Sequence, residues 1–248
     1  MTTHIFTVSP DFTPDRLSGW FIFNTWLQKV LDLHFHLQLY DDFQSQREAI
    51  ESDKVDLIYA NPYDAAMLVR EKGFKPLAKF GGIADEAIIA VSAHSPFEKI
   101  EDLPSGIRLA TTDDPDVHMM GMIMLEPAEL DAGAIQMVDC DNYVLVAKQL
   151  IKQTAEAGIF LVEAYNGLSS VIRRELRVLV RSQIQVVHHS LMIAPGIQEH
   201  RKPLLDALLT AHQCEKGQGV LEALGCAQWE PVDDEDMEFM IDLMDTLT

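Results

Sequence analysis

Phe6-Thr-Val-Ser-Pro-Asp-Phe-Thr-Pro-Asp15 and Val55-Asp-Leu-Ile-Tyr-Ala-Asn-Pro-Tyr-Asp64 are the two stretches that decide the fold. Each reads as a short apolar strand that runs into a polar turn and then into a helix start. This arrangement gathers loops and helix N-termini at the carboxyl edge of a parallel sheet. Small ligands bind at that edge in α/β proteins, so both stretches point to a ligand site.

Both turns carry the residues that begin helices. Thr13 and Asn61 are predicted N-caps, because their side-chain oxygens can accept from backbone N–H groups of the first helical turn. Pro14 and Pro62 suit the first helical position, where no N–H is needed. Around these turns the pattern predicts a first strand that begins within five residues of the start, helices over 14–32, 42–52 and 62–72, and strands over 34–39, 55–60 and 75–80.

The rest of the chain predicts a second lobe and a return to the first. An apolar strand over 86–93 is expected to cross over, and a strand over 186–193 to cross back. The elements predicted between and after them are strands over 107–111, 134–138 and 158–162, and helices over 117–125, 142–152, from 163, 198–213 and 235–247. This order predicts an α/β protein with mostly parallel sheets flanked by helices. The predicted lobes are residues 1–84 with 190–248, and 90–184, with hinge crossings near 85–90 and 185–190.

Composition restricts the classes of partner. The formal net charge of −20 opposes binding to nucleic acid or to an anionic membrane surface. No apolar run approaches the roughly 18 residues that a membrane span requires, so no membrane insertion is expected. The three cysteines lack metal or disulfide spacing and favour a reducing compartment. The start shows no secretory pattern, which predicts a cytoplasmic location as numbered, or a periplasmic one if a leader was removed.

The two opening stretches, in this order, resemble the phosphate/phosphite/phosphonate-binding branch of the type II periplasmic solute-binding proteins. The resemblance extends to Asp85-Glu-Ala-Ile-Ile-Ala-Val-Ser92, Phe97-Glu-Lys-Ile-Glu-Asp-Leu-Pro-Ser-Gly106 and Ala155-Glu-Ala-Gly-Ile-Phe160. It implies a two-lobed fold that closes around a small polar or anionic ligand held between the lobes. No cofactor, metal or catalytic residue is implied.

The resemblance also implies which residues touch the ligand. Those in the first lobe are Ser9, Pro10, Asp11, Phe43, Asn61, Pro62 and Tyr63. Those in the second lobe and the return crossing are Thr111, Thr112, Asp114, His118, Glu163, Tyr165 and His188. We expect His118 to face the cleft near Asn61, Tyr63 and Tyr165.

The second lobe departs from the resembling family. Relatives carry a Ser-Thr-Ser-Gly type turn whose hydroxyls hold the oxyanion, whereas this chain has Thr111-Thr-Asp-Asp-Pro-Asp-Val-His-Met-Met-Gly121. A carboxylate beside a bound dianion opposes it, so phosphate, phosphite and phosphonate are predicted to bind weakly. Asp114 or Asp116 either caps the following helix or touches the ligand, and His118 either contacts the ligand or is structural.

Three functions fit these observations. The first is non-catalytic binding of a small molecule by an intracellular sensor or carrier, whose transporter or signalling partner is unknown. The second is a cytosolic enzyme similar to the menaquinone-pathway lyases and cyclases, with His118 or His188 as base and Asp114 or Glu163 as its partner. The third is the mature periplasmic component of an ABC transporter.

Overall fold

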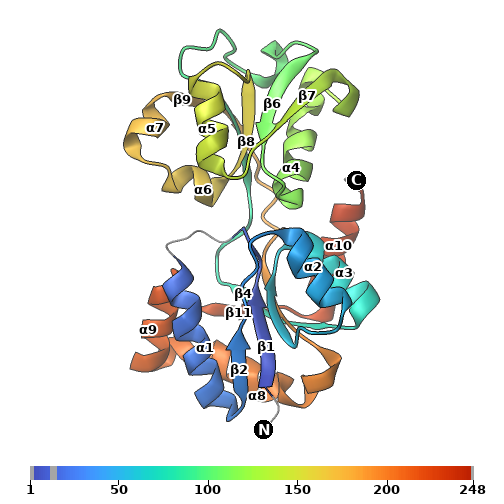
Figure 1. Ribbon diagram of the computed structural model, residues 1–248, viewed down its shortest axis with the longest axis vertical. Helices are drawn as coiled ribbons and strands as arrows, with labels where there is room; N and C mark the ends of the chain where they lie inside the picture. The colour runs from blue at the N-terminus through green and yellow to red at the C-terminus, as the bar shows by residue number, and fades with distance from the viewer. Residues whose placement is uncertain (1–2, 12–15, 247–248) are drawn as a thin grey trace. The chain divides into compact units, whose positions relative to one another are not determined.

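The computed structural model describes residues 3–11 and 16–246. The chain divides into two compact units, which we call unit 1 (Met1–Ile83 and His188–Asp245) and unit 2 (Ala84–Val187). Each unit has its own β-sheet with helices packed against it, and the two sheets share no described strand (Figure 1). The predicted α/β class with two helix-flanked sheets is therefore confirmed.

Unit 1 is built on a mixed sheet. Its strands and α-helices are β1 (Thr3–Val8), α1 (Leu17–Leu31), β2 (His34–Leu37), α2 (Phe43–Glu51), β3 (Leu57–Ala60), α3 (Pro62–Lys72), β4 (Lys75–Phe80), β10 (Ser190–Ile193), α8 (Arg201–Thr210), α9 (Glu215–Leu224), β11 (Trp229–Pro231) and α10 (Asp234–Thr246). The strand order is β11-β4-β10-β3-β1-β2. β1 pairs in parallel with β2 and β3, while β10 lies antiparallel between β3 and β4. The first strands of the chain therefore end at one edge, where β10 begins.

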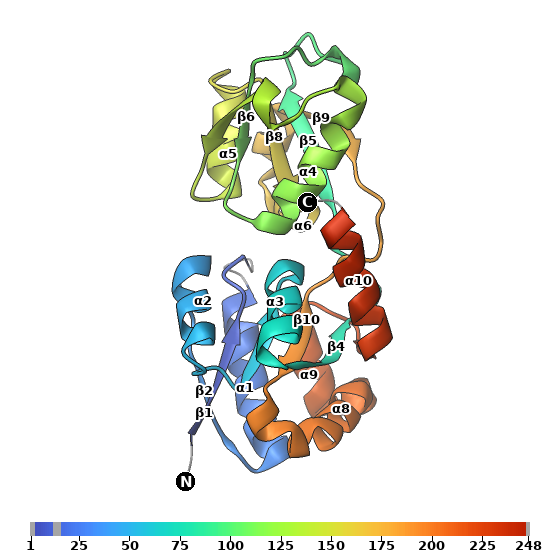
Figure 2. The ribbon, with the colours of Figure 1, turned by 90° about the vertical axis from the view of Figure 1, so that its right-hand side faces the viewer.

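The core of unit 1 lies between one face of this sheet and three helices. Trp20, Phe23 and Leu27 of α1 are almost fully buried there, as are Leu204 of α8 and Leu221 of α9. In Figure 1, α2 and α3 lie on the other side of β1 from α1. Figure 2 shows α8 and α9 close together in unit 1. The sheet is thus covered on both faces, which leaves the strand ends for polar residues.

The ends of α3 follow the sequence prediction. The Asn61 side chain accepts from the Asp64 N–H, Pro62 is the first helical residue, and Gly73 ends the helix with φ of 66°. A left-handed residue at this position suits glycine, which has no Cβ to clash. The predicted cap and start are confirmed here, whereas the predicted Thr13 cap and Pro14 start lie outside the described residues.

Unit 2 has a second mixed sheet. Its strands and α-helices are β5 (Ala87–Ser92), β6 (Ile107–Thr111), α4 (Pro115–Leu125), β7 (Ile135–Asp139), α5 (Tyr143–Ile151), β8 (Ala157–Leu161), α6 (Val162–Gly167), α7 (Ser170–Arg174) and β9 (Leu176–Arg181). The strand order is β7-β6-β8-β5-β9, with β6 parallel to β7 and β8, and β5 antiparallel to both of its neighbours. Separate buried clusters fill its two faces, one including α4 and the other including α5.

Some elements differ from the prediction. The helix expected from residue 163 is two short helices, α6 and α7, followed by strand β9, which pairs with β5. Helix α9 and strand β11 were not predicted, and the strand at the return crossing covers only Ser190–Ile193 of the expected 186–193. Within the described ranges, no helix has both the length and the apolar character needed to cross a bilayer.

Candidate functional site

The carboxyl ends of β1 and β3 bring two polar turns together in unit 1. The strands are parallel, and Val8 pairs with Tyr59. The Ser9 N–H then donates to the Tyr59 carbonyl at 2.8 Å, which continues the ladder one residue past β1. Asn61 follows β3 directly, so Ser9 and Asn61 leave the sheet side by side.

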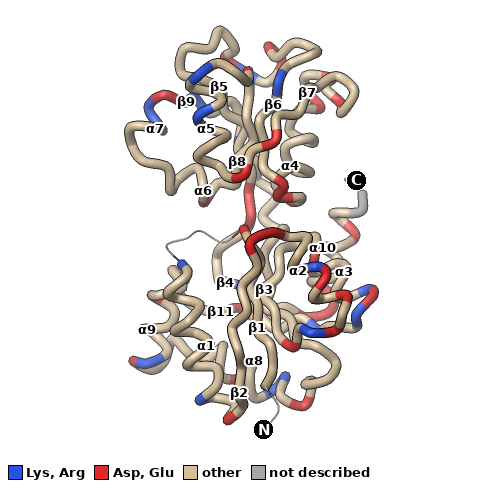
Figure 3. Tube along the Cα trace, viewed as in Figure 1, with Lys and Arg blue, Asp and Glu red and all other residues tan. Residues whose placement is uncertain are grey.

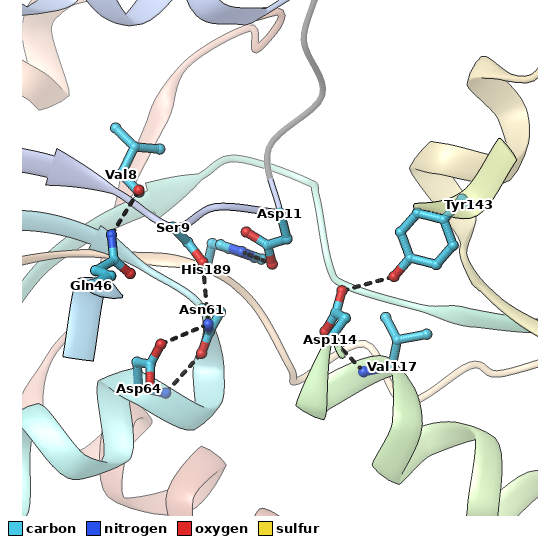
Figure 4. Close-up of polar contacts among 10 residues, drawn as sticks. All are labelled: Val8, Ser9, Asp11, Gln46, Asn61, Asp64, Asp114, Val117, Tyr143 and His189. Carbon is cyan, nitrogen blue, oxygen red and sulfur yellow. Dashed lines mark hydrogen bonds and ion pairs between the residues drawn. The ribbon is translucent and has the colours of Figure 1, made fainter. Parts of the chain in front are cut away.

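Asn61 is fixed by hydrogen bonds on both ends of its amide. Its Nδ2 donates to Ser9 Oγ at 3.1 Å and to Asp64 Oδ2 at 2.9 Å, while its Oδ1 accepts from the Asp64 N–H at 2.7 Å (Figure 4). The residue is fully buried. One side chain therefore caps α3 and holds the hydroxyl of the neighbouring turn.

Asp64 is a fully buried carboxylate with a charged partner. Arg47 Nε donates to Asp64 Oδ1 at 2.6 Å. Burial raises the pKa of the Asp64 carboxyl, and the hydrogen bond and charge of Arg47 only partly offset this. The Arg47 guanidinium also lies over two rings, 4.9 Å from the centroid of Tyr63 and 5.4 Å from that of Phe43. Arg47 thereby links the buried network to Tyr63, which is 46% exposed.

Asp11 and His189 form a second polar pair in unit 1. His189 Nε2 lies 2.9 Å from Asp11 Oδ2 (Figure 4). The His189 ring stacks on the Tyr59 ring, with centroids 5.5 Å apart. Burial works to raise the pKa of the Asp11 carboxyl, but the charge and hydrogen bond of His189, with a smaller contribution from the Ser9 hydroxyl, hold this pKa below its usual range. Asp11 is therefore ionised at neutral pH.

The segment just before β10 contains two adjacent histidines with different partners. His188 is a predicted site residue, and its Nδ1 lies 3.0 Å from Oγ of Ser190, the first residue of β10. His189 is the histidine that contacts the turn after β1. The two histidines therefore have different partners, and His189 is the one that meets Asp11.

In unit 2, the turn after β6 is a helix cap. Asp114 is the N-cap of α4 and accepts from the Val117 N–H at 3.3 Å. The Tyr143 hydroxyl donates to Asp114 Oδ2 at 2.8 Å (Figure 4). Thr111 and Thr112 are buried beside it. The interpretation of Asp114 as a cap is confirmed, and its contact with a ligand stays a prediction.

The remaining predicted site residues vary in exposure. His118 is half-buried in the first turns of α4, and Glu163 is exposed at the start of α6. Tyr165 is buried with its ring centroid 5.5 Å from that of Phe160, and burial raises the pKa of its phenol. Pro10 is half-buried in the turn after β1.

Sequence reasoning missed several members of these networks. Arg47, Asp64, His189 and Tyr143 were not among the predicted site residues. A signal for Asp64 was present, because an acidic residue three positions after a cap is the pattern of a capping box. The other three depend on pairing between distant segments, which has no local signature.

The turns at both sheet edges carry more acidic than basic side chains. Figure 3 shows Asp and Glu at the connection that precedes α4 and at the one that precedes α2. The segment from Thr111 to His118 contains Asp113, Asp114 and Asp116 and no Lys or Arg. Among the described residues, no group of three or more His, Cys, Asp or Glu side chains is placed to hold a metal ion.

Unit 2 also has a separate cavity of about 320 Å³ alongside α5. Its lining includes Asp139, Cys140, Lys148 and Lys152. None of the predicted site residues lines this cavity. It is therefore an alternative ligand site, and binding experiments can distinguish it from the sheet edges.

Comparisons with known proteins show which family this chain matches. Residues 6–237 match the profile of a family described as "ABC transporter, phosphonate, periplasmic substrate-binding protein". A search of curated proteins gives no match.

Among solved structures, PhnD1 from Prochlorococcus marinus in complex with methylphosphonate has a TM-score of 0.82 at 13% identity, with 99% of this chain and 98% of that chain covered. XAC2383 from Xanthomonas citri bound to ATP has a TM-score of 0.81 at 15% identity, with 100% and 98% covered. A binding protein component of an ABC phosphonate transporter from Pseudomonas aeruginosa has a TM-score of 0.78 at 15% identity, with 99% and 89% covered. At these identities the three structures show the fold alone.

Proposed function

Because the chain belongs to the family of periplasmic substrate-binding proteins of phosphonate ABC transporters, we propose that it captures a small polar molecule without chemical change and delivers it to a transporter permease. The ligand contacts the polar turns at the carboxyl edge of the unit 1 sheet. The involvement of unit 2 residues, Asp114 and His118 among them, stays a prediction from the sequence.

One observation carries the proposal. Three segments far apart in the sequence bring Ser9, Asp11, Asn61 and His189 to one sheet edge, linked by the hydrogen bonds Asn61 to Ser9 and His189 to Asp11. Such groups are held in place before a ligand arrives, which lowers the entropic cost of binding. Tyr63, with its ring against Arg47, adds an exposed aromatic surface beside them.

The family also bears on location. Its members are periplasmic substrate-binding proteins, which supports the periplasmic alternative and gives no support to the cytoplasmic prediction. The comparisons likewise give no support to the lyase or cyclase alternative. We therefore favour transport over sensing and over catalysis.

Ligand identity is not fixed by the fold, since two similar structures hold methylphosphonate and ATP. The acidic segment after β6 supports the prediction that simple oxyanions bind only weakly, because a carboxylate beside a dianion repels it. We expect calorimetry at neutral pH to show no micromolar affinity for methylphosphonate, phosphite or phosphate. Micromolar binding of any of them would show that backbone N–H groups outweigh the acidic side chains.

A thermal-shift screen across oxyanions, carboxylates and amines tests the function, because a ligand that binds only the folded state raises the unfolding temperature. We expect at least one class to do so, and Asn61→Ala to weaken its binding by roughly 10-fold or more, the effect of losing about 1.4 kcal/mol of binding free energy.

The control is Ser169→Ala, which removes the N-cap of α7 and should leave affinity unchanged. Both variants should lose about 1 kcal/mol of stability through the lost cap. Equal affinity in the parent and both variants would remove Asn61 from the site.

A further inference from the structure

The Asp11 carboxylate has one oxygen that is paired and one that is not. Oδ2 contacts His189 Nε2 at 2.9 Å. Oδ1 is buried and accepts no hydrogen bond from any residue that the structure describes. The side chain as a whole is 5% exposed. A buried, ionised oxygen without a donor is costly, and a ligand or an ordered water that donates to it would remove this cost.

His189, whose charge acts on Asp11, contacts the other oxygen, Oδ2, at 2.9 Å. Arg47, a second cation of unit 1, is engaged with Asp64 at 2.6 Å. Asp64 adds a second negative charge close enough to Asp11 for the two carboxylates to repel. Neither Lys nor Arg occurs among residues 9–15 of the sequence. The unit 1 edge is therefore suited to a hydrogen-bond donor that carries positive charge.

We propose that the ligand carries a protonated amine and that an ammonium N–H donates to Asp11 Oδ1. This inference rests on the proposed function, because it names the chemical class of ligand for the same site. An N⁺–H···O⁻ contact of about 2.7–2.9 Å would satisfy the oxygen. Tyr63, two residues after Asn61, is 46% exposed and can contact the rest of the molecule.

The geometry also separates amines by type. A primary ammonium has N–H donors and charge, whereas a quaternary ammonium has charge alone. A simple oxyanion has no N–H donor and no positive charge. Its negative charge would be repelled by the Asp11 carboxylate. Primary amines should therefore bind more tightly than their trimethylated counterparts, and simple oxyanions should bind least.

The test is calorimetry with matched probes on the full chain. Ethanolamine, putrescine and γ-aminobutyrate represent primary amines, choline is the trimethylated counterpart of ethanolamine, and acetate, phosphate and methylphosphonate represent oxyanions. Asp11→Asn removes the charge and keeps the shape of the side chain. Asp41→Asn removes an exposed carboxylate from the connection before α2 and is the matched control. Circular dichroism and urea unfolding confirm that each variant is folded.

We expect at least one primary amine to bind, choline to bind more weakly than ethanolamine, and Asp11→Asn to weaken amine binding by roughly 10-fold or more, the usual effect of losing a charge-assisted hydrogen bond. Asp41→Asn should change amine affinity by less than about 2-fold, because an exposed charge acts weakly.

Two outcomes overturn the inference and leave the proposed function standing. One is an oxyanion that binds the parent while no amine does. The other is amine binding that is equally tight in Asp11→Asn and the parent. If no probe of any class binds, both the inference and the proposed function fail. Should Asp11→Asn not fold, the choline and ethanolamine comparison on the parent decides, and equal affinity for the two refutes the N–H donation.

Discussion

Arg47 and Asp64 form a charged pair that contacts two predicted site residues, Asn61 and Tyr63. Asp64 is fully buried, and its carboxylate accepts from Arg47 and from the Asn61 amide. Arg47 in turn lies over the Tyr63 ring. This salt bridge therefore connects the Asn61 amide with the Tyr63 ring.

Arg47→Met should lower the free energy of unfolding by about 1–3 kcal/mol, because it leaves a buried carboxylate without its charged donor. The Arg47 side chain is 32% exposed, so solvent screening keeps the effect below that of a fully buried pair. Urea unfolding measures the change.

The matched control for that variant is Arg70→Met. Arg70 lies 4.0 Å from Asp242, whose side chain is 77% exposed. Surface pairs contribute about 0–1 kcal/mol, so this variant should change little. If Arg47→Met costs no more than Arg70→Met, the pair with Asp64 has no structural role.

At the scale of elements, helices and strands with local signals could be predicted and those with distant partners could not. Helix α3 begins at Asn61-Pro62 and ends at Gly73, as the residue types indicate. Strand β11, in contrast, has three residues, and its pairing is with β4, far away in the sequence. The same holds for β9, whose place beside β5 gives it its conformation.

Helix α9 was missed for a different reason. It contains Gly217 and Gly219, which lower intrinsic helix propensity by about 1 kcal/mol each relative to alanine. Packing explains Gly217, since a Cβ there would lie 2.1 Å from the Ala211 carbonyl oxygen. The Ala211 carbonyl thus lies so close to α9 that only glycine fits at position 217, although glycine has a low helix propensity.

The contact between α1 and α9 also requires a residue without a Cβ, at Gly19. A Cβ on Gly19 would lie 2.2 Å from the Ala223 carbonyl oxygen. Gly19→Ala should therefore destabilise the protein by about 1–3 kcal/mol through overpacking. Thermal and urea unfolding measure this loss.

Gly219→Ala is the control, because no atom lies within 4 Å of its added Cβ. This variant should be neutral or gain up to about 1 kcal/mol from helix propensity. Two variants of equal stability would show that α1 and α9 do not pack as closely as described.

In the candidate site, as among the helices and strands, residues with a local sequence signal could be predicted and residues with distant partners could not. Ser9 and Asn61 follow β1 and β3 directly, and Asp11 lies two residues after Ser9. These three candidates could therefore be predicted from the strand pattern. His189 could not be separated from His188, since the choice depends on how the segment before β10 meets the turn after β1, which is distant in the sequence. Arg47 could not be predicted either, because its role arises from contacts with Asp64 and Tyr63 on another helix.

At the scale of the whole molecule, each unit has its own sheet and buried core. In unit 2, the buried Glu86 carboxylate connects the start of β5 with the segment that leads back to unit 1. It accepts from the Ser182 hydroxyl and from the N–H groups of Ile184 and Gln185, the latter at 2.8 Å. The two chain segments that join the units are thus held together by one side chain.

Heteronuclear NMR can test whether the ligand binds at the carboxyl edge of the unit 1 sheet, by mapping amide shifts on ligand addition. With the tightest-binding probe of the screen, we expect the largest perturbations at Ser9, Asp11, Asn61 and His189. Perturbations confined to the lining of the α5 cavity, such as Asp139, or scattered over unit 1 away from its sheet edge would contradict this expectation.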